Sequence, residues 1–309
     1  MKHFFQFHLT GNKLFALWIA CIVFLIGPYV GLIVFMKDFK SPQASLLFLP
    51  LLLLLTIAAL LISFYMFKIF VENFSVNDNR LAFNGSFGVY IGKILVGIFL
   101  TTITLGIYGA WFVKNIQQFF IDNISYKDSS FSFKGKGGNL FGILLLTLFL
   151  PMIILVTIVT VLQLNSAINS PVFAVLNQIF TFIILTPYMY MVYKWMVNVD
   201  YKTYHISWNT EFFSACGKIL LEILFTVITL GIYYPLAYLR LYQYFINRTI
   251  AKSENSIINF GFDIENAGKD LLFIWGQILL ILITFTIYYP WAISKIGVRF
   301  VNRTYYLQE

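Results

Sequence analysis

One charged pair stands inside an apolar stretch of the sequence. Glu222 follows Lys218 by four residues, so the two side chains share one face of a helix. Carboxylates in apolar membrane segments are costly, and they tend to mark the paths of ions or substrates. The pair is therefore a candidate ligand site, and a structural ion pair near the interface is the alternative. Lys93 has the same place as Lys218 in an earlier, similar segment, where Gly97 replaces Glu222.

Further candidate residues lie within three similar segments, Ile91–Ile121, Ala215–Ile246 and Leu271–Val301. Each has an apolar first arm, a break at Gly or Pro, and a second arm with charges and amides. Aromatic rings near the break could form a belt at the membrane interface, or they could line a pocket together with the basic residues. These candidates are Tyr108, Trp111, Tyr233, Arg240, Tyr288, Trp291 and Lys295.

Motifs of known enzymes do not occur in the sequence. The three histidines, His3, His8 and His205, lie outside the apolar stretches, and their spacing does not fit a metal site. Neither a G-x-S-x-G motif nor a phosphate-binding G-x-x-x-x-G-K-[ST] loop is found. We therefore expect no catalytic residue, no metal and no cofactor, and we predict that the protein is not an enzyme.

The composition is that of a membrane protein. Apolar residues make up 60% of the 309 residues and charged residues only 11%, whereas a soluble domain has about 25% charged residues. Four uncharged stretches are each long enough for a bilayer-spanning helix, which needs about 20 residues. They are Leu14–Met36, Leu46–Phe67, Leu140–Leu164 and Val172–Tyr193.

Internal similarity divides the chain into units. Residues 81–108 align without a gap to residues 206–233, with 14 of 28 positions identical, which indicates duplication. A shorter similarity joins residues 229–249 to residues 284–304. We therefore predict repeat 1 at 1–125, repeat 2 at 126–250 and a partial repeat 3 at 251–309.

The charges predict the topology. If each T-L-G-I-Y segment crosses the membrane once, the 21 basic residues divide 9 to 12 between the two sides. If each segment returns to the side from which it enters, only Lys37 and Lys40 lie on the opposite side. Because cytoplasmic loops carry the excess of Lys and Arg, this arrangement places both termini in the cytoplasm. Alternating aromatic residues at 81–83, 131–133 and 206–208 predict short strands in the loops on the basic side.

The signature TLGIYGAW (104–111), TLGIYYPL (229–236) and TFTIYYPW (284–291) resembles that of the YjgN-like family of bacterial inner-membrane proteins. The first copy lacks the Pro, the second the Trp and the third the Gly. The resemblance covers most of the chain through its repeats. It implies a multi-pass protein of the inner membrane, and it implies no reaction.

The predicted fold is an all-α integral membrane protein of tandem repeats. Each repeat has a transmembrane hairpin and a broken, re-entrant or short-hairpin segment, with short β pieces in the loops. We expect a transport- or channel-like protein with a cavity between the repeats. The alternative is a non-catalytic membrane module that binds lipid or protein. The net charge of +8 predicts contact with anionic lipid headgroups and not with nucleic acid, and any protein partner is unknown.

Overall fold

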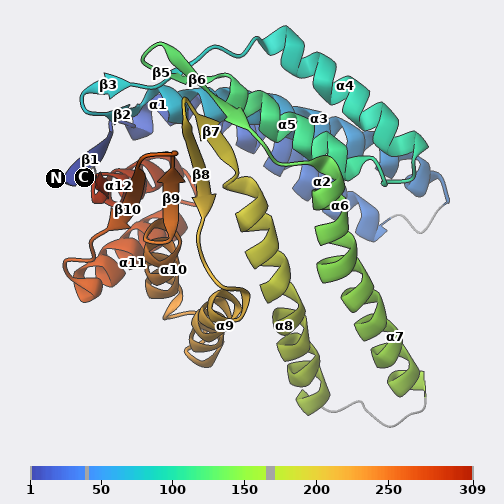
Figure 1. Ribbon diagram of the computed structural model, residues 1–309. Coiled ribbons are helices and arrows are strands. Elements are labelled where there is room, and N and C mark those ends of the chain that lie inside the picture. Colours follow the sequence, from blue (N-terminus) through green and yellow to red (C-terminus); the bar gives the residue numbers. More distant parts are fainter. Residues whose placement is uncertain (1, 39–41, 165–170, 308–309) are drawn as a thin grey trace.

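The computed structural model describes residues 2–38, 42–164 and 171–307. These residues form long apolar helices, three helical hairpins and one sheet of eleven strands. In Figure 1 the strands gather at the upper left, and the helices extend from them. The structure is thus a ring of strands with helices attached to it.

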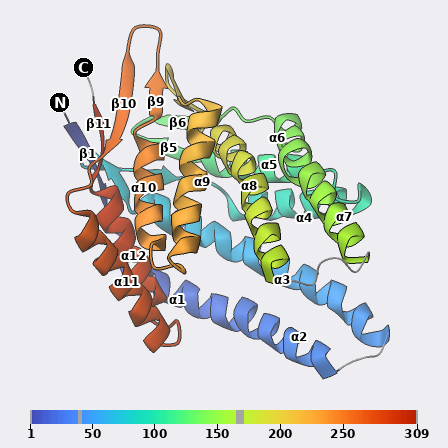
Figure 2. The same cartoon turned by 90° about the horizontal axis from the view of Figure 1, so that it is seen from below.

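The long helices come from the uncharged stretches of the sequence. They are α1 (Gly11–Cys21), η1 (Ile22–Ile26), α2 (Gly27–Asp38), α3 (Pro42–Glu72), α6 (Gly137–Ile143), η2 (Leu144–Phe149), α7 (Leu150–Leu164) and α8 (Pro171–Met196). The segments η1 and η2 are π-helical turns inside otherwise continuous helices. The pair α2–α3 leaves the strands in a different direction from the pair α7–α8 (Figures 1 and 2).

Within the described residues, three helices are long and apolar enough to cross a membrane. They are Gly11–Gly31, Pro50–Glu72 and Gly137–Leu162, and they overlap three of the four predicted spans. The fourth predicted span lies in α8, which is not one of these three. Lys40, one of the two residues on which the predicted topology depends, lies outside the described residues.

Each of the three T-x-x-I-Y segments forms a pair of helices joined by a tight turn. The pairs are α4 (Phe87–Ile103) with α5 (Gly109–Asp122), α9 (Phe212–Ile228) with α10 (Tyr234–Ile246), and α11 (Ala267–Ile283) with α12 (Tyr289–Val301). We call them hairpins 1, 2 and 3. The first helix has 17 residues in every pair.

Hydrogen bonds in the turn explain the T-L-G-I-Y motif. In hairpin 2, Leu230 and Gly231 have φ of 50° and 87°, and the Gly231 N–H donates to the Thr226 carbonyl at 2.8 Å, as in a Schellman motif. Thr229 Oγ1 then accepts the Tyr233 N–H at 3.0 Å and caps the second helix. The corresponding pairs elsewhere are Gly106–Thr101, Tyr108–Thr104, Thr286–Ile281 and Tyr288–Thr284.

The strands connect these helical units at one end of the molecule. They are β1 (Lys2–Phe7), β2 (Phe74–Val76), β3 (Asn79–Arg80), β4 (Ala82–Phe83), β5 (Ile124–Tyr126), β6 (Ser129–Phe133), β7 (Val199–Tyr201), β8 (Tyr204–Trp208), β9 (Thr249–Lys252), β10 (Ile257–Phe262) and β11 (Thr304–Leu307). All pairs are antiparallel, in the order β3-β2-β1-β11-β10-β9-β8-β7-β6-β5-β4.

The two edges of this sheet nearly meet. The edge strands β3 and β4 are separated in the chain by Leu81 alone, so the sheet must curl into a nearly closed ring. Tyr126 Oη in β5 donates to the Val76 carbonyl of β2 at 3.1 Å and links the sheet across the opening. We call this structure the strand ring.

The predicted all-α fold is therefore wrong. The pieces at 81–83, 131–133 and 206–208, which were expected as minor additions in loops, belong to one sheet that joins all parts of the chain. Strands this short are stabilised by pairing with strands far away in the sequence, and a local pattern does not show that pairing. The division of the chain into three sequence units is not tested by the structure and stays a prediction.

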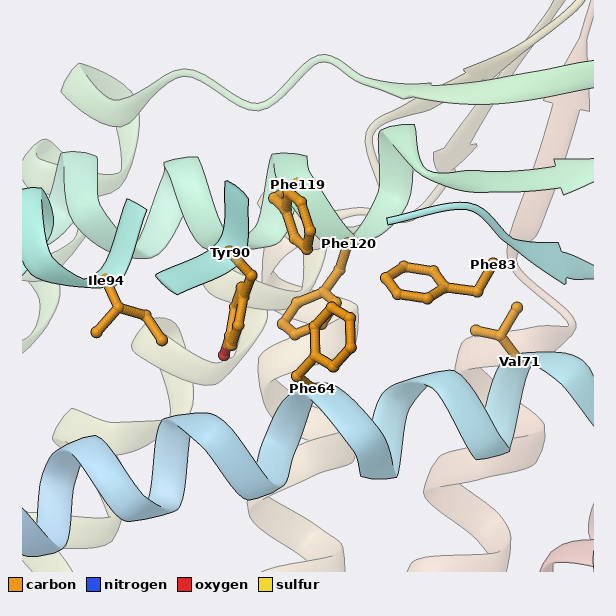
Figure 3. Close-up of a cluster of buried hydrophobic side chains, with 7 residues drawn as sticks. All are labelled: Phe64, Val71, Phe83, Tyr90, Ile94, Phe119 and Phe120. Carbon is orange, nitrogen blue, oxygen red and sulfur yellow. The ribbon is translucent and has the colours of Figure 1, made fainter. Parts of the chain in front are cut away.

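Buried aromatic side chains hold hairpin 1 against α3. Figure 3 shows seven buried hydrophobic side chains of this cluster, five of them aromatic, from α3, β4, α4 and α5: Phe64, Val71, Phe83, Tyr90, Ile94, Phe119 and Phe120. Tyr90 Oη donates to the Leu60 carbonyl at 2.9 Å, so the polar end of the ring is satisfied inside the cluster. The cluster fixes the base of hairpin 1 beside the strand ring.

Candidate functional site

The inner face of the strand ring lines a cavity of about 640 Å³. Alternate residues of a strand point to the same face, so Tyr204 and Ile206 of β8 and Ile258 and Phe260 of β10 all face inward. The lining is Phe5, Phe74, Val76, Asn77, Leu81, Tyr126, Lys127, Phe131, Tyr201, Lys202, Tyr204, Ile206, Tyr242, Ile246, Thr249, Ala251, Ile258, Phe260, Val301, Thr304 and Tyr306. We call this space the ring cavity.

The wall of the ring cavity is aromatic and aliphatic, and its polar groups are few. Tyr242 Oη from α10 and Thr304 Oγ1 from β11 are 2.8 Å apart and bond to each other. Tyr201 Oη donates to the Tyr126 carbonyl at 2.9 Å. Burial raises the pKa of both Tyr126 and Tyr201, so their hydroxyl groups stay protonated and act as donors. Most hydroxyls are thus used within the wall.

Two lysines are the charged residues of the lining. Lys127 lies in the two-residue turn between β5 and β6, and Lys202 lies in the matching turn between β7 and β8. Their φ angles of 52° and 53° are in the left-handed region in both turns. Each ammonium group lies over a tyrosine of the lining, at 5.5 Å from the ring centroid of Tyr126 for Lys127 and at 5.6 Å from that of Tyr201 for Lys202.

The side chains that line the ring cavity are mostly apolar and aromatic. The lining has no carboxylate, cysteine or histidine, so it offers neither a general base nor a strong nucleophile among the described residues. Metal-ligand side chains also do not gather in groups of three or more in the part of the chain that is described. The volume and the apolar wall are those of a typical site for a small apolar molecule.

The sequence-predicted charged residues of hairpin 2 come together. Glu222 is 2% exposed and pairs with Lys218, and its Oε2 accepts the Tyr233 hydroxyl at 2.8 Å. Arg240 Nη1 in turn donates to Tyr233 Oη at 2.6 Å. The four side chains form one continuous chain of polar contacts between α9 and α10, which we call the Glu222 chain.

The predicted residues of hairpin 3 form a similar contact in which Gln277 takes the place of the acid. Lys295 Nζ donates to Tyr288 Oη at 2.7 Å, and Tyr288 Oη donates to Gln277 Oε1 at 3.3 Å. A second buried carboxylate, Asp270, was not predicted from the sequence. It is 1% exposed and accepts hydrogen bonds from Arg299 Nε at 2.6 Å and Arg303 Nη1 at 2.9 Å.

In hairpin 1 the rings of Tyr108 and Trp111 stack at 6.3 Å between centroids, but Lys93 lies elsewhere. Tyr108 Oη accepts from Asn115 at 3.2 Å, whereas Lys93 lies at a separate polar pocket of about 340 Å³ with Gln118 and Asp122. Trp111 packs on α6 and covers Gly137. The ten predicted site residues therefore belong to separate hairpins and do not form one site.

The remaining tryptophan, Trp291, has a structural contact. Its indole Nε1 donates to Asn12 Oδ1 at 3.0 Å, and the ring covers Gly11 so closely that a side chain there would collide with it. This contact holds hairpin 3 against α1. Not one of the ten predicted residues lines the ring cavity. Alternating aromatic residues and lysine-containing turns were the signals that could have identified it.

The comparison with known proteins identifies a family. No curated protein and no solved structure matches the chain. The family model described as "bacterial protein of unknown function (DUF898)" matches residues 1–267, and the resemblance of the T-L-G-I-Y signature to the YjgN-like family is consistent with it. Since the match covers most of the 309 residues, this chain belongs to the DUF898 family of bacterial proteins.

Proposed function

We propose that the protein is a non-catalytic membrane module that binds an apolar, lipid-like ligand in the ring cavity. The observation that carries this proposal is a cavity of about 640 Å³ with an almost wholly apolar and aromatic wall. Apolar walls with a few placed polar groups are typical of small-molecule sites. Such a wall gains free energy when it removes apolar surface of a ligand from water.

The membrane is the source of ligand in this proposal. The three apolar helices extend from the same strands that enclose the cavity, so the lipids around these helices would lie near the cavity. We place the protein in the bacterial inner membrane as a multi-pass protein, with the strand ring and both termini on the cytoplasmic side. The excess of basic residues supports this orientation, and it also supports contact with anionic headgroups.

Exposed apolar side chains at the tips of the hairpins favour a position of these tips within the lipid. The residue at the apex of each turn is large and apolar and almost fully exposed: Leu230 is 93% exposed, Leu105 93% and Phe285 88%. Exposed apolar side chains at three equivalent tips are costly in water and favourable in the acyl layer. This placement makes the hairpins anchors of the strand ring.

The test is the binding of a neutral, apolar fluorescent probe, N-phenyl-1-naphthylamine, to the full chain in nanodiscs of phosphatidylcholine. Ile258 faces into the ring cavity, and its neighbour Asn259 does not line it. We expect Ile258→Trp to reduce probe binding about tenfold by filling the cavity, and Asn259→Trp to leave it unchanged. Equal binding by both variants and the wild type would place the probe outside the ring cavity and refute the proposal.

Transport, the function first expected from the sequence, is the second candidate. The buried Glu222 chain is the observation that favours it, because intramembrane carboxylates often lie on transport paths. The contacts of Glu222 are with Lys218 and Tyr233, and the cavity described above lies in the strand ring. The geometry therefore supports binding more directly. Proteoliposomes in which Glu222→Gln abolishes substrate-driven flux would reverse this preference.

A further inference from the structure

The ring cavity has a polar entrance made by two lysines. Lys127 and Lys202 occupy adjacent hairpin turns of the ring, and both side chains are exposed. Their supporting tyrosines, Tyr126 and Tyr201, have ring centroids 6.1 Å apart and are joined by the hydrogen bond from Tyr201 Oη to the Tyr126 carbonyl. Each ammonium group therefore lies over one of two neighbouring tyrosines of the same wall.

Neither lysine has a carboxylate at ion-pair distance in the part of the chain that is described. The hairpins differ in this respect, because Lys218 pairs with Glu222 and Arg299 pairs with Asp270. Asp128 shares the turn of Lys127, and Asp78 lies in the turn between β2 and β3, but neither carboxylate lines the cavity. The entrance thus presents positive charge to a ligand whose apolar part lies inside.

The volume limits the apolar part of the ligand. A group of the size of a water molecule occupies about 30 Å³ of liquid, so a cavity of about 640 Å³ holds about twenty such groups. A fatty acid with one long chain has about that size. Size and charge together define a single-chain ligand with an anionic head.

Resting on the proposed function, we infer that the ring cavity takes a single-chain anionic amphiphile, with its chain inside the ring and its carboxylate or phosphate between Lys127 and Lys202. A charged acceptor at this place receives charge-assisted hydrogen bonds from both ammonium groups. It replaces no existing ion pair, because the lysines have none in the described structure.

The test compares amphiphiles of one chain length as competitors of the neutral probe. Palmitate, lysophosphatidate with a palmitoyl chain, hexadecanol and hexadecyltrimethylammonium are titrated into the full chain in nanodiscs. We expect at least one anion to bind about three- to tenfold tighter than hexadecanol, which corresponds to two partly exposed charge contacts. The tighter of the two anions identifies the head group as a carboxylate or a phosphate.

Charge variants test whether the preference for anions depends on Lys127 and Lys202. We expect the ratio of anion to alcohol affinity to fall to about one in the double variant Lys127→Gln, Lys202→Gln. The matched double variant Lys68→Gln, Lys252→Gln removes the same charge from lysines that do not line the cavity, and it should keep the wild-type ratio. A ratio that falls equally in both variants would assign the preference to net charge and overturn the inference.

The outcomes separate this inference from the proposed function. If hexadecanol displaces the probe as well as palmitate and lysophosphatidate do, the cavity binds apolar chains but has no anion site, and only the inference is overturned. Tighter binding of the ammonium compound than of either anion also overturns it. If neither the probe nor hexadecanol binds, the proposed function itself fails.

Discussion

Hairpins 1 and 2 have the same turn conformation, but the side chains between their two helices differ in polarity. At the positions that Glu222 and Ala237 occupy in hairpin 2, hairpin 1 has Gly97 and Phe112. The Phe112 ring fills the space so tightly that a Cβ added to Gly97 would lie 2.0 Å from it. The space between the two helices is thus filled by an aromatic ring in hairpin 1. In hairpin 2 it is filled by a buried carboxylate with polar partners.

Hairpin 3 follows the polar arrangement without the acid. Gln277 and Ala292 stand at the positions of Glu222 and Ala237, and Gln277 accepts from the Tyr288 hydroxyl. A large residue on the first helix is therefore always opposite a small one on the second, or the reverse. The turn and the summed side-chain volume are thus common to the hairpins, whereas the polarity of the interior varies.

The largest expected effect is the transfer of the acid into hairpin 1. Gly97→Glu places a side chain where the Phe112 ring lies. It also buries a negative charge, and the ring leaves no space in which a basic side chain could pair with it. Overpacking and an uncompensated charge each cost about 1–5 kcal/mol, so we expect a loss of more than about 3 kcal/mol in the free energy of unfolding. Unfolding of the purified chain in a mixed-detergent titration measures it.

The double variant Gly97→Glu, Phe112→Ala is the matched control. It recreates the pairing of hairpin 2, with Lys93 and Tyr108 at the positions of Lys218 and Tyr233. We expect it to recover at least half of the lost stability, because both the space and the partners are restored. A double variant that is as unstable as Gly97→Glu alone would contradict the volume-exchange interpretation.

A smaller effect is expected within the Glu222 chain. Glu222→Ala leaves Tyr233 without its acceptor and opens a void, and we expect a loss of about 2 kcal/mol in the free energy of unfolding. Glu222→Gln retains an acceptor, as Gln277 does in hairpin 3, and should cost less than about 1 kcal/mol. Equal losses would show that the negative charge, and not the hydrogen bond, stabilises hairpin 2.

The smallest expected effect is at the turn that all hairpins share. Thr286 has a φ of 71° where hairpins 1 and 2 have Gly106 and Gly231, and a side chain in this region costs about 1–2 kcal/mol. We therefore expect Thr286→Gly to raise the free energy of unfolding by about 1 kcal/mol. Gly231→Thr should lower it by a similar amount. Stabilisation by both changes would mean that the turns are not equivalent.

The local features of the fold followed from the sequence. The long uncharged stretches predicted helices that the structure contains, and the T-L-G-I-Y motif marked three breaks that became capped turns. The pair Lys218 and Glu222 was also predicted correctly as a contact on one helix face. Tyr233 and Arg240 were named as candidates, but their bond to Glu222 depends on the return of the second helix, which a motif alone does not position.

The strand ring was decided by tertiary structure alone. Its strands have two to six residues, and neighbours such as β1 and β11 lie at opposite ends of the chain. The sequence by itself determined the apolar helices, the hairpin turns and the basic character, because each depends on residues close together in the chain. The ring cavity and its two lysines exist only after distant strands pair, since a cavity is a property of surfaces that meet across the fold and not of any one segment.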